Sequence, residues 1–429
     1  MGESLHNVST RARILRPAIA RPETARSRDR VALHRSAPEN TMMAIVFCLV
    51  CFGVVIVYSA TSSQAVIAGT SPFAFMEKQF LFAGIGAMTF TFCRRWDPKY
   101  LHRVAGMGLV VSMAALCLVL LPGIGVQVNG ARRWIAFPLL GQIQPAEFAK
   151  LTLVLWIAGA IARDPRRVMT FKGLIPYLTV TLLIAGLVLA EPDLGTATTL
   201  AFVAFAMLLV AGARPRHVAV AATAAGLIAA VAIAAAPYRR ARLLAFLDPW
   251  HQATGNGFQT VQAQIAVGSG GFHGMGLGAG IQKAFYLPEA HTDMILASIG
   301  EELGFIGICA VLAALGAVVL LAFRIAIRAP DLHQRLIATG LATLIAVQSL
   351  DNAGAALGVM PITGVPLPFI SYGGSSLIVL LSSMGLLFSI SRRSQRASRQ
   401  QQTTDASTHR RQRDGRARDA SARRRGSAA

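Results

Sequence analysis

The feature that most constrains this chain is a series of ten apolar blocks, each about as long as a helix needs to cross the hydrocarbon core of a bilayer. Hydrophobic residues make up 54% of the chain and charged residues only 14%, whereas about a quarter of the residues in a typical soluble domain are charged. We therefore predict an all-α polytopic membrane protein with ten transmembrane helices. The blocks lie near residues 43–61, 79–93, 104–121, 147–162, 174–190, 196–212, 217–236, 294–323, 336–358 and 374–391.

Basic residues mark one side of this predicted bundle. Because Arg and Lys near span ends are retained in the cytoplasm, the loops that carry them are expected inside the cell, together with both termini. The opposite loops 191–195 and 358–373 contain neither Lys nor Arg. The basic residues on the predicted cytoplasmic side are Arg94, Arg95, Lys99, Arg103, Arg163, Arg166, Arg167, Lys172, Arg214, Arg216, Arg324, Arg328, Arg335, Arg392 and Arg393. The exceptions on the opposite side are Arg132 with Arg133, and Arg239 with Arg240 and Arg242.

The net charge of +21 is concentrated in two tails, residues 1–41 and 394–429, which flank a membrane domain at 42–393. Both tails mix Arg with small and polar residues and lack an apolar period, so neither can bury enough surface to fold alone. Arg-rich tails bind nucleic acid or anionic lipid. Because these tails adjoin membrane spans, we expect lipid at the cytoplasmic face and no nucleic-acid partner. No apolar stretch precedes residue 42, so the first span is expected to act as its own targeting signal.

A carboxylate stands where the chain re-enters the membrane. Asp293 ends the run Tyr286-Leu-Pro-Glu-Ala-His-Thr-Asp293, and apolar residues follow at once. An ionisable group at a lipid boundary is costly unless something uses or neutralises it. Asp293 is therefore the first candidate for chemistry.

The long loop that leads to Asp293, about 237–293, is expected on the extracytoplasmic side, between the seventh and eighth helices. A loop of this length is usually functional. Its segment 268–280 is rich in glycine, but no Gly-Lys-Ser/Thr follows and a strand-helix unit is not expected here, which argues against a nucleotide site. The glycines indicate either close approach of backbone amides to a ligand or tight folding of the loop against the bundle. The sequence does not separate these two interpretations.

A second loop on the same side, about 122–146, leads into the fourth span. Pro145 suits a helix start. Glu147 and Lys150 are three residues apart, so they share a helix face and can form an ion pair. Such a pair is either a structural contact or part of a polar cavity. In the next loop on this side, Asp193 is expected to cap the sixth span.

A third loop, 358–376, joins the last two spans. Its prolines and glycines cannot form a regular helix, and exposed backbone would not be tolerated in lipid. We expect this loop to pack against protein or to line a cavity. Asp351 and Asn352 lie just inside the ninth span, where buried polar groups need partners, and hydrogen bonds between spans are their expected role.

Long motifs in these loops resemble those of the SEDS family (shape, elongation, division and sporulation), over about residues 43–393. Within that family the chain is more similar to the division branch, FtsW, than to the elongation branch, RodA. The motifs are Asn129-Gly-Ala-Arg-Arg-Trp-Ile135, Gln144-Pro-Ala-Glu-Phe-Ala-Lys150, Arg240-Ala-Arg-Leu-Leu-Ala-Phe-Leu-Asp-Pro-Trp250, Leu287-Pro-Glu-Ala-His-Thr-Asp293 with Ile299-Gly-Glu-Glu-Leu-Gly304, and Pro366-Leu-Pro-Phe-Ile-Ser-Tyr-Gly-Gly-Ser-Ser376.

The resemblance implies a ten-span polymerase that joins lipid II, an undecaprenyl-linked disaccharide-pentapeptide, into peptidoglycan strands at the outer face of the cytoplasmic membrane. It also implies a class B penicillin-binding protein as the transpeptidase partner, other membrane proteins of the division machinery, and a place at the septum. In the family pattern Asp293 is the essential acid, Arg133 is the matching arginine, and Glu147 and Lys150 line a central cavity. The runs 350–353 and 365–367 depart from the division pattern, so an elongation polymerase stays as an alternative.

The residues themselves suit this chemistry. Glycosyl transfer from a lipid diphosphate needs one base for the acceptor hydroxyl, because the diphosphate leaves readily once its charge is met. We predict Asp293 as that base, kept ionised by its place at the mouth of the membrane. Arginine suits contacts to diphosphate. The predicted substrate-binding residues are Arg133, Glu147, Lys150, Arg242, His291, Ser371 and Tyr372. The sequence contains no recognisable set of carboxylates dedicated to a metal. A divalent cation, Mg²⁺ or Mn²⁺, is kept as a possible cofactor.

Two alternatives from other classes remain at this point. A transporter that flips lipid II would also use polar residues within a bundle, although the polar groups here gather at one face and no inverted repeat is visible. A noncatalytic scaffold of the division machinery would not need Asp293.

Overall fold

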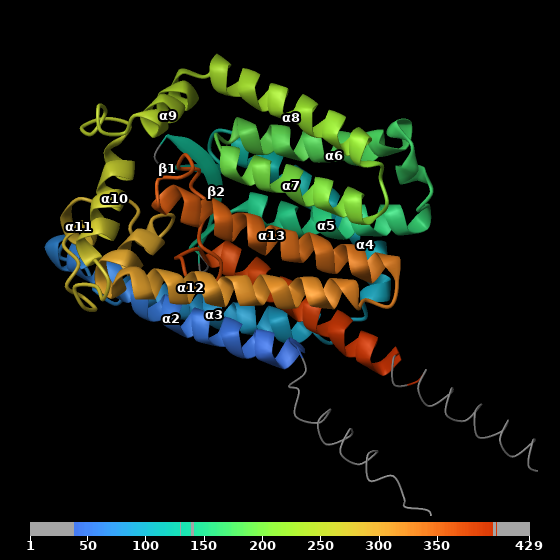
Figure 1. Cartoon of the computed structure of the whole chain (residues 1–429), viewed down its shortest axis with the longest axis horizontal. Helices are drawn as coiled ribbons and strands as arrows, with labels where there is room; N and C mark the ends of the chain where they lie inside the picture. The colour runs from blue at the N-terminus through green and yellow to red at the C-terminus, as the bar shows by residue number, and fades with distance from the viewer. Residues whose placement is uncertain (1–37, 129, 139–140, 398–399, 401–429) are drawn as a thin grey trace, which may run out of the picture. The chain divides into compact units, whose positions relative to one another are not determined.

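The computed structural model describes residues 38–128, 130–138, 141–397 and 400, and each of the ten predicted apolar blocks overlaps a helix in it (Figure 1). The prediction of an all-α polytopic fold is confirmed. The long helices are α2 (Pro38–Ile67), α3 (Ala74–Cys93), α4 (Leu101–Leu120), α5 (Pro145–Arg163), α6 (Phe171–Ala190), α7 (Leu194–Val210), α8 (Pro215–Ala235), α12 (Ile295–Ile327), α13 (Leu332–Ala356) and a C-terminal helix, Gly374–Ala397. Two single 3₁₀ turns, η1 (Pro98–Tyr100) and η2 (Arg167–Met169), precede α4 and α6.

Eight of these helices are long and apolar enough to cross a membrane by length and composition. The other two are α3 and α7. Helix α7 has only 17 residues, and α3 carries Glu77, Lys78 and Gln79 in its first turns, which lowers its hydropathy. The chain is thus a multi-pass helical membrane protein, and the count of ten spans stays a prediction. Helix α2 begins at Pro38 rather than near residue 42, and the C-terminal helix runs to Ala397, so residues 38–41 and 394–397 of the predicted tails are helical. The rest of both tails lies outside the described residues, Gln400 apart.

The centre of the bundle is formed by α5, α13 and the C-terminal helix. In their most apolar stretches 67%, 78% and 83% of the residues are buried, whereas the value for α8 is 11%. Outward-facing side chains on the other helices include Phe47, Phe80 and Leu320, which are large, apolar and exposed, as expected for a surface in contact with lipid. Polar side chains on the central helices are therefore shielded from lipid by the outer helices.

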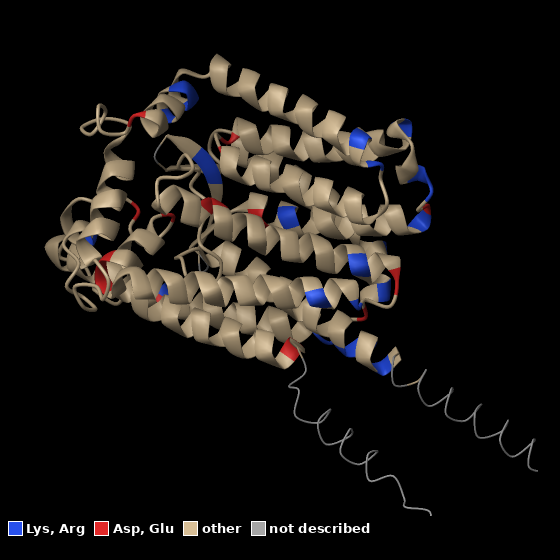
Figure 2. Ribbon diagram, viewed as in Figure 1, with Lys and Arg blue, Asp and Glu red and all other residues tan. Residues whose placement is uncertain are grey.

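The two ends of the bundle carry different kinds of sequence. At the arginine end lie the α3–α4, α5–α6, α7–α8 and α12–α13 junctions and the last turns of the C-terminal helix. At the loop end lie the α4–α5 and α6–α7 connections, the segment 236–294 and the loop 357–373. Figure 2 shows that most Lys and Arg lie at the arginine end, on the right of the view.

A small antiparallel sheet at the loop end was not part of the prediction. It is formed by β1 (Gly125–Val128), β2 (Ala131–Phe137) and β3 (Gly141–Ile143) in the order β1-β2-β3, with Gly125 opposite Ile135 and Ile135 opposite Ile143. An Asn-Gly dipeptide between β-prone runs is a strong hairpin signal, and it occurs here as residues 129–130. Asn129 itself lies outside the described residues. The sheet orients Arg132 and Arg133 on the middle strand.

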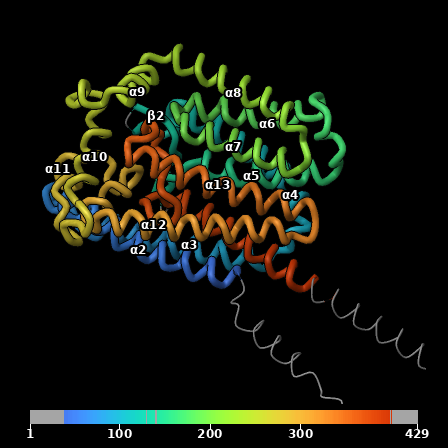
Figure 3. Tube along the Cα trace, viewed as in Figure 1, coloured from blue at the N-terminus to red at the C-terminus, as the bar shows by residue number. Residues whose placement is uncertain are grey.

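The segment 237–293 is also more ordered than a connecting loop. It contains α9 (Pro237–Leu247), α10 (Phe258–Gly270) and the short α11 (Gln282–Phe285), which lie at the left of the trace in Figure 3. The glycines between α10 and α11 pack backbone to backbone against α12. A Cβ at Gly270 would lie 1.9 Å from the carbonyl oxygen of Gly300, and one at Gly274, where φ is +80°, would lie 2.1 Å from that of Glu302. Tight folding against the bundle is thus the confirmed interpretation of these two glycines.

Candidate active site

Asp293 lies at the loop end, in the connection just before α12. Its side chain is half-buried. Within the described residues, the carboxylate atom Oδ1 accepts two long side-chain hydrogen bonds, from Nε2 of Gln259 on α10 at 3.5 Å and from Oγ1 of Thr292 at 3.4 Å. These weak contacts leave most of the acceptor capacity of the carboxylate available for another donor.

The backbone around Asp293 is held much more firmly than its side chain. Nδ2 of Asn352 on α13 donates to the Asp293 carbonyl at 2.8 Å, and it also donates to the Val365 carbonyl at 2.9 Å. Oγ of Ser371 donates to the Thr292 carbonyl at 2.6 Å, and the Tyr372 amide donates to the His291 carbonyl at 2.9 Å. Helix α13 and the loop 357–373 therefore fix the backbone that carries the Asp293 carboxylate, as a preorganised catalytic group requires.

The loop 357–373 supplies much of this support, as its prolines and glycines suggested. Val365, Leu367, Phe369 and Ile370 are all buried in the protein. The prediction that this loop packs against protein is confirmed for residues 365–371, whereas Val359 and Met360 in its first half are exposed. Asn352 makes the expected hydrogen bonds, although its partners lie in two loops rather than in a neighbouring span.

Three rings form a cluster beside this support. His291 lies 4.9 Å from Phe75 of α3 and 5.6 Å from Tyr372, measured between ring centroids, and Phe75 lies 5.2 Å from Tyr372. Burial lowers the pKa of His291, with the Glu289 carboxylate acting in the opposite direction. The imidazole is therefore neutral near pH 7. Ser371 and Tyr372, predicted as substrate-binding residues, contact the Asp293 loop itself.

Burial, together with the neighbouring Glu289 carboxylate, raises the pKa of Asp293 to about 7, against the lowering effects of a backbone hydrogen bond, Arg242 and Thr292. The expectation that the mouth of the membrane would keep this carboxylate ionised by limiting desolvation was wrong, because the surrounding helices and loops remove more water than that. A base with a pKa close to 7 is well suited to proton abstraction at neutral pH.

Two arginines at the loop end donate to backbone carbonyls of two different loops. The guanidinium of Arg242, on α9, stacks over the Tyr238 ring at 4.8 Å and donates to the Ile362 carbonyl at 3.5 Å. The guanidinium of Arg133, on β2, donates to the carbonyls of Glu191 and Pro192. Among the described residues neither guanidinium belongs to an ion pair. Both keep a positive charge that a phosphate could meet.

Glu147 and Lys150 form the predicted ion pair in the first turns of α5. Nζ of Lys150 lies 2.7 Å from Oε1 of Glu147, and the two side chains are only 1% and 3% exposed. The same helix start is tied to its neighbours by Gln144, whose amide donates to Oγ of Ser375 and whose side chain donates to Asp193. The pair is thus a buried contact at the base of the loop end. A direct substrate contact of Lys150 stays a prediction.

The α6–α7 turn adds a carboxyl group that the sequence analysis passed over. Glu191 is fully buried, and neither of its carboxyl oxygens has a hydrogen-bond partner among the described residues. Burial, with the nearby Asp193 carboxylate, raises the pKa of Glu191 to about 8, against the lowering effect of Arg133. Glu191 is therefore mostly protonated at pH 7. Asp193 accepts from the Thr196 amide at 2.9 Å, which confirms its predicted role as the cap of α7.

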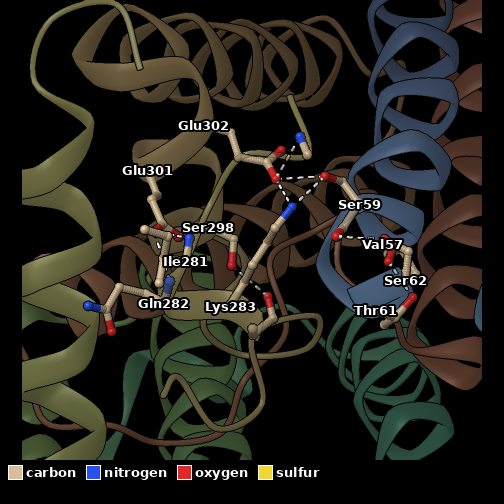
Figure 4. Close-up of polar contacts among 12 residues, drawn as sticks. Val57, Ser59, Thr61, Ser62, Ile281, Gln282, Lys283, Ser298, Glu301 and Glu302 are labelled. Atoms are coloured by element: carbon tan, nitrogen blue, oxygen red, sulfur yellow. Dashed lines mark hydrogen bonds and ion pairs between the residues drawn. The ribbon is translucent and has the colours of Figure 1, made fainter. Parts of the chain in front are cut away.

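A second buried ion pair, also missed from the sequence, anchors the segment that leads to Asp293 (Figure 4). The ammonium of Lys283, on α11, pairs with Glu302 of α12 and donates to Oγ of Ser59 of α2 at 2.8 Å. Ser59 donates to Glu302 at 2.6 Å. Next to it, Glu301 accepts from the amides of Ile281 and Gln282 at 2.7 and 2.8 Å. Two features of the sequence could have indicated this pair. They are the single Lys just after the glycine-rich segment 268–280 and the two adjacent Glu in the apolar block 294–323.

No group of three or more His, Cys, Asp or Glu side chains that could hold a metal ion occurs within the part of the chain that the structure describes. A divalent cation at this site stays a prediction.

The profile of the FtsW, RodA and SpoVE family, described as "Cell cycle protein", matches residues 39–396. The chain belongs to this family. The match spans every helix from α2 to the C-terminal helix and so includes Asp293, Arg133, Arg242 and both buried ion pairs.

Several members of the family are similar to the chain over most of its length. The probable peptidoglycan glycosyltransferase FtsW of Geobacter metallireducens is 40% identical over 353 residues, which are 82% of this chain and 94% of that protein. The stage V sporulation protein E of Bacillus subtilis is 38% identical over 360 residues, 83% of this chain and 98% of that protein.

Solved structures agree with the family. One, reported for the structural coordination of polymerization and crosslinking by a peptidoglycan synthase complex, is 31% identical with a TM-score of 0.67, covering 82% of this chain and 96% of that chain. The rod shape determining protein RodA of Thermus thermophilus is 29% identical with a TM-score of 0.60, covering 82% and 95%.

Proposed function

We propose that this protein is a peptidoglycan glycosyltransferase that polymerises lipid II into glycan strands during cell division. The observation that carries the proposal is Asp293, a carboxylate with a pKa of about 7 whose backbone is fixed by Asn352 and Ser371 and whose charge is offset by Arg242. Relatives named as probable peptidoglycan glycosyltransferase FtsW, about 40% identical over most of the chain, support the reaction class and the division branch.

In the proposed reaction Asp293 takes the proton of the acceptor sugar hydroxyl. The acceptor oxygen forms a bond to the anomeric carbon of the donor as the bond between that carbon and the diphosphate oxygen breaks. The diphosphate leaves with the electron pair as undecaprenyl diphosphate, and the guanidinium groups of Arg242 and Arg133 meet its charge. Glu147 and Lys150 hold the start of α5 in place, since separating a buried ion pair would leave an uncompensated charge.

The same proposal fixes the orientation in the cytoplasmic membrane. The loop end faces the outside, where the sugars are polymerised, and the arginine end faces the cytoplasm together with both termini. The support for this is the distribution of basic residues, because Lys and Arg gather at one end of the bundle (Figure 2). A class B penicillin-binding protein is the proposed partner at the septum, supported by the similarity to a chain from a peptidoglycan synthase complex.

The test uses the purified full chain with lipid II, with and without a class B penicillin-binding protein, and follows glycan strands on gels. Asp293→Asn should lose strand synthesis by a factor of about 10² to 10⁴, the usual contribution of a general base. Asp248→Asn is the matched control, because Asp248 lies exposed at the same end and contacts His251 rather than the Asp293 loop.

Normal polymerisation by Asp293→Asn would reject the assignment. In reconstituted vesicles, movement of lipid II across the bilayer without strand synthesis would instead establish the transporter alternative. Labelling with an impermeant reagent at a cysteine introduced at residue 289 tests the orientation independently of activity.

A further inference from the structure

A basic pocket opens at the arginine end, far from Asp293 along the helices. It has a volume of about 360 Å³ and is lined by the end of α3 and the end of the C-terminal helix. Five arginines face it and one carboxylate, so the lining carries an excess of four positive charges. The lining residues are Arg94, Arg95, Trp96, Asp97, Ser389, Arg392, Arg393 and Arg396.

The walls of this pocket are held together by specific contacts. Oγ of Ser389 donates to the Trp96 carbonyl at 2.8 Å, and Arg393 pairs with Asp97, although the partners are almost 300 residues apart in the chain. Phe90 and Phe388, one helical turn deeper, meet edge to face at 6.1 Å between ring centroids. The arginines thus converge because the fold brings two helix ends together.

Retention of positive charge in the cytoplasm does not require such convergence. Arg166 and Arg216 lie at the same end and are exposed at separate junctions of the bundle, where they serve the orientation rule equally well. A pocket with one acid and five guanidinium groups has a use beyond orientation, because guanidinium groups are suited to bind phosphate oxygens.

An apolar groove on the outer face of α3 continues from this pocket. Its lining residues, Gly84, Ala87, Met88, Thr91, Phe92 and Arg95, recur at three and four residues and so share one helix face. The groove is shallow and open and measures about 470 Å³. Met88 and Phe92 in its lining are 68% and 62% exposed, while Gly84 and Ala87 add little bulk. Arg95 lines both cavities, so the groove and the basic pocket meet at this residue.

The dimensions of the groove match one leaflet of a membrane. From residue 84 to residue 95 a helix rises about 16 Å, close to half of the roughly 30 Å hydrocarbon core of a bilayer. Trp96 lies at the basic end and is partly exposed, as expected for an aromatic residue at the membrane interface. The arrangement, apolar along one leaflet and strongly cationic at its surface, is complementary to a lipid with an anionic headgroup.

We propose that this site binds an anionic phospholipid of the leaflet at the arginine end, with one acyl chain in the α3 groove and the phosphate among Arg94, Arg95 and Arg392. Basic pockets between membrane helices recognise anionic headgroups in this way. The bound lipid bridges α3 and the C-terminal helix. The site is separate from the proposed reaction, and its existence does not depend on which compartment the arginine end faces.

The test is native mass spectrometry of the full chain purified in detergent and titrated with dioleoyl phosphatidylglycerol or dioleoyl phosphatidylcholine. The parent protein should retain phosphatidylglycerol in preference to phosphatidylcholine. Arg95→Gln with Arg392→Gln should weaken phosphatidylglycerol binding about thirtyfold, given the usual contribution of each basic residue near an anionic lipid. Arg166→Gln with Arg216→Gln removes the same charge from the same end and should bind like the parent.

A second variant tests the groove separately. Ala87→Trp fills the groove without changing charge. It should weaken phosphatidylglycerol binding about tenfold, which corresponds to the binding free energy lost when roughly two methylene groups of the acyl chain are no longer buried. It should leave binding of soluble glycerol phosphate at its low parent level. Equal binding of phosphatidylglycerol by the parent and by the variant that carries Arg95→Gln with Arg392→Gln would overturn the proposal. Glycerol phosphate binding as tight as that of the lipid would identify a soluble phosphate ligand and overturn it as well.

Discussion

The two ends of the bundle handle charge in opposite ways. At the arginine end, Arg94, Arg166 and Arg216 are exposed to the surroundings. At the loop end charged groups are fewer but more deeply buried, and Lys150 and Lys283 are each paired with a glutamate inside the protein. The difference teaches that burial of charge, rather than its amount, marks the end where chemistry is proposed, because desolvation is one of the main causes of shifted pKa values at functional sites.

The ends also differ in how they are built. The arginine end consists of short junctions between helices, with a few contacts between distant segments such as that of Arg393 with Asp97, whereas at the loop end such contacts hold the long connections that surround Asp293. Lys283, for example, bonds both Ser59 and Glu302, and Asn352 bonds residues 293 and 365. Such a network fixes Asp293 only while all of its members are present. Variants at the loop end are therefore expected to change stability and strand synthesis more than charge-matched variants at the arginine end.

The largest effect is expected for the buried pair of α11 and α12. Lys283→Met leaves the Glu302 carboxylate buried without its partner, and breaking a buried pair in this way costs about 3–5 kcal/mol of stability. The midpoint of thermal unfolding in detergent should fall, together with strand synthesis. Adding Glu302→Met should restore much of the lost stability, since no charge is then left unpaired. A Lys283→Met protein as stable as the parent would show that the loop end does not depend on this pair.

An intermediate effect is expected for the cation nearest to Asp293. Arg242→Gln removes a charge that lowers the pKa of Asp293, so the acid limb of the pH–rate profile should move upward. Loss of a charged contact to the diphosphate should also lower kcat/KM about ten- to hundredfold. Arg240→Gln is the matched control, because Arg240 is an exposed residue of the same helix. Equal kinetics for the two variants would remove Arg242 from the site.

The smallest effect concerns the neutral carboxyl group of the α6–α7 turn. Because Glu191 has a pKa of about 8 in the folded protein, above that of an unfolded glutamate, the unfolded state loses this proton first as the pH rises. Stability should therefore decrease between about pH 4.5 and pH 8 through this group. Glu191→Gln should flatten that part of the dependence of the unfolding midpoint on pH and leave stability at pH 7 equal or higher. An unchanged slope would mean that Glu191 ionises normally.

The helices, and the contacts between residues of one helix, could be predicted from the sequence. Long apolar blocks have few alternatives to helices in a bilayer, and the spacing of Glu147 and Lys150 alone places them on one face. The Asp193 cap follows from the same local reasoning. The pairing of Lys283 with Glu302 could not be predicted, because it depends on how the glycine segment folds against α12, and several glycines allow many paths.

The pKa of Asp293 shows a second limit of sequence reasoning. The position of Asp293 at the membrane boundary could be predicted from the run that precedes α12. Its desolvation, however, depends on Gln259, Asn352 and the loop 357–373, which are distant in the sequence. The sheet of the α4–α5 connection was missed for a simpler reason, because its Asn-Gly turn signal was not weighed against the apolar blocks on either side.

The central claim is that Asp293 is the base of the proposed glycosyl transfer and that its burial sets the pH at which it works. Its direct test is the dependence of kcat/KM for lipid II polymerisation on pH, measured from pH 5 to pH 9 for the parent protein. An acid limb near pH 7 that moves downward in Glu289→Gln, where one neighbouring carboxylate is removed, is the predicted result. An acid limb near pH 4, or one that does not respond to Glu289→Gln, would contradict the account.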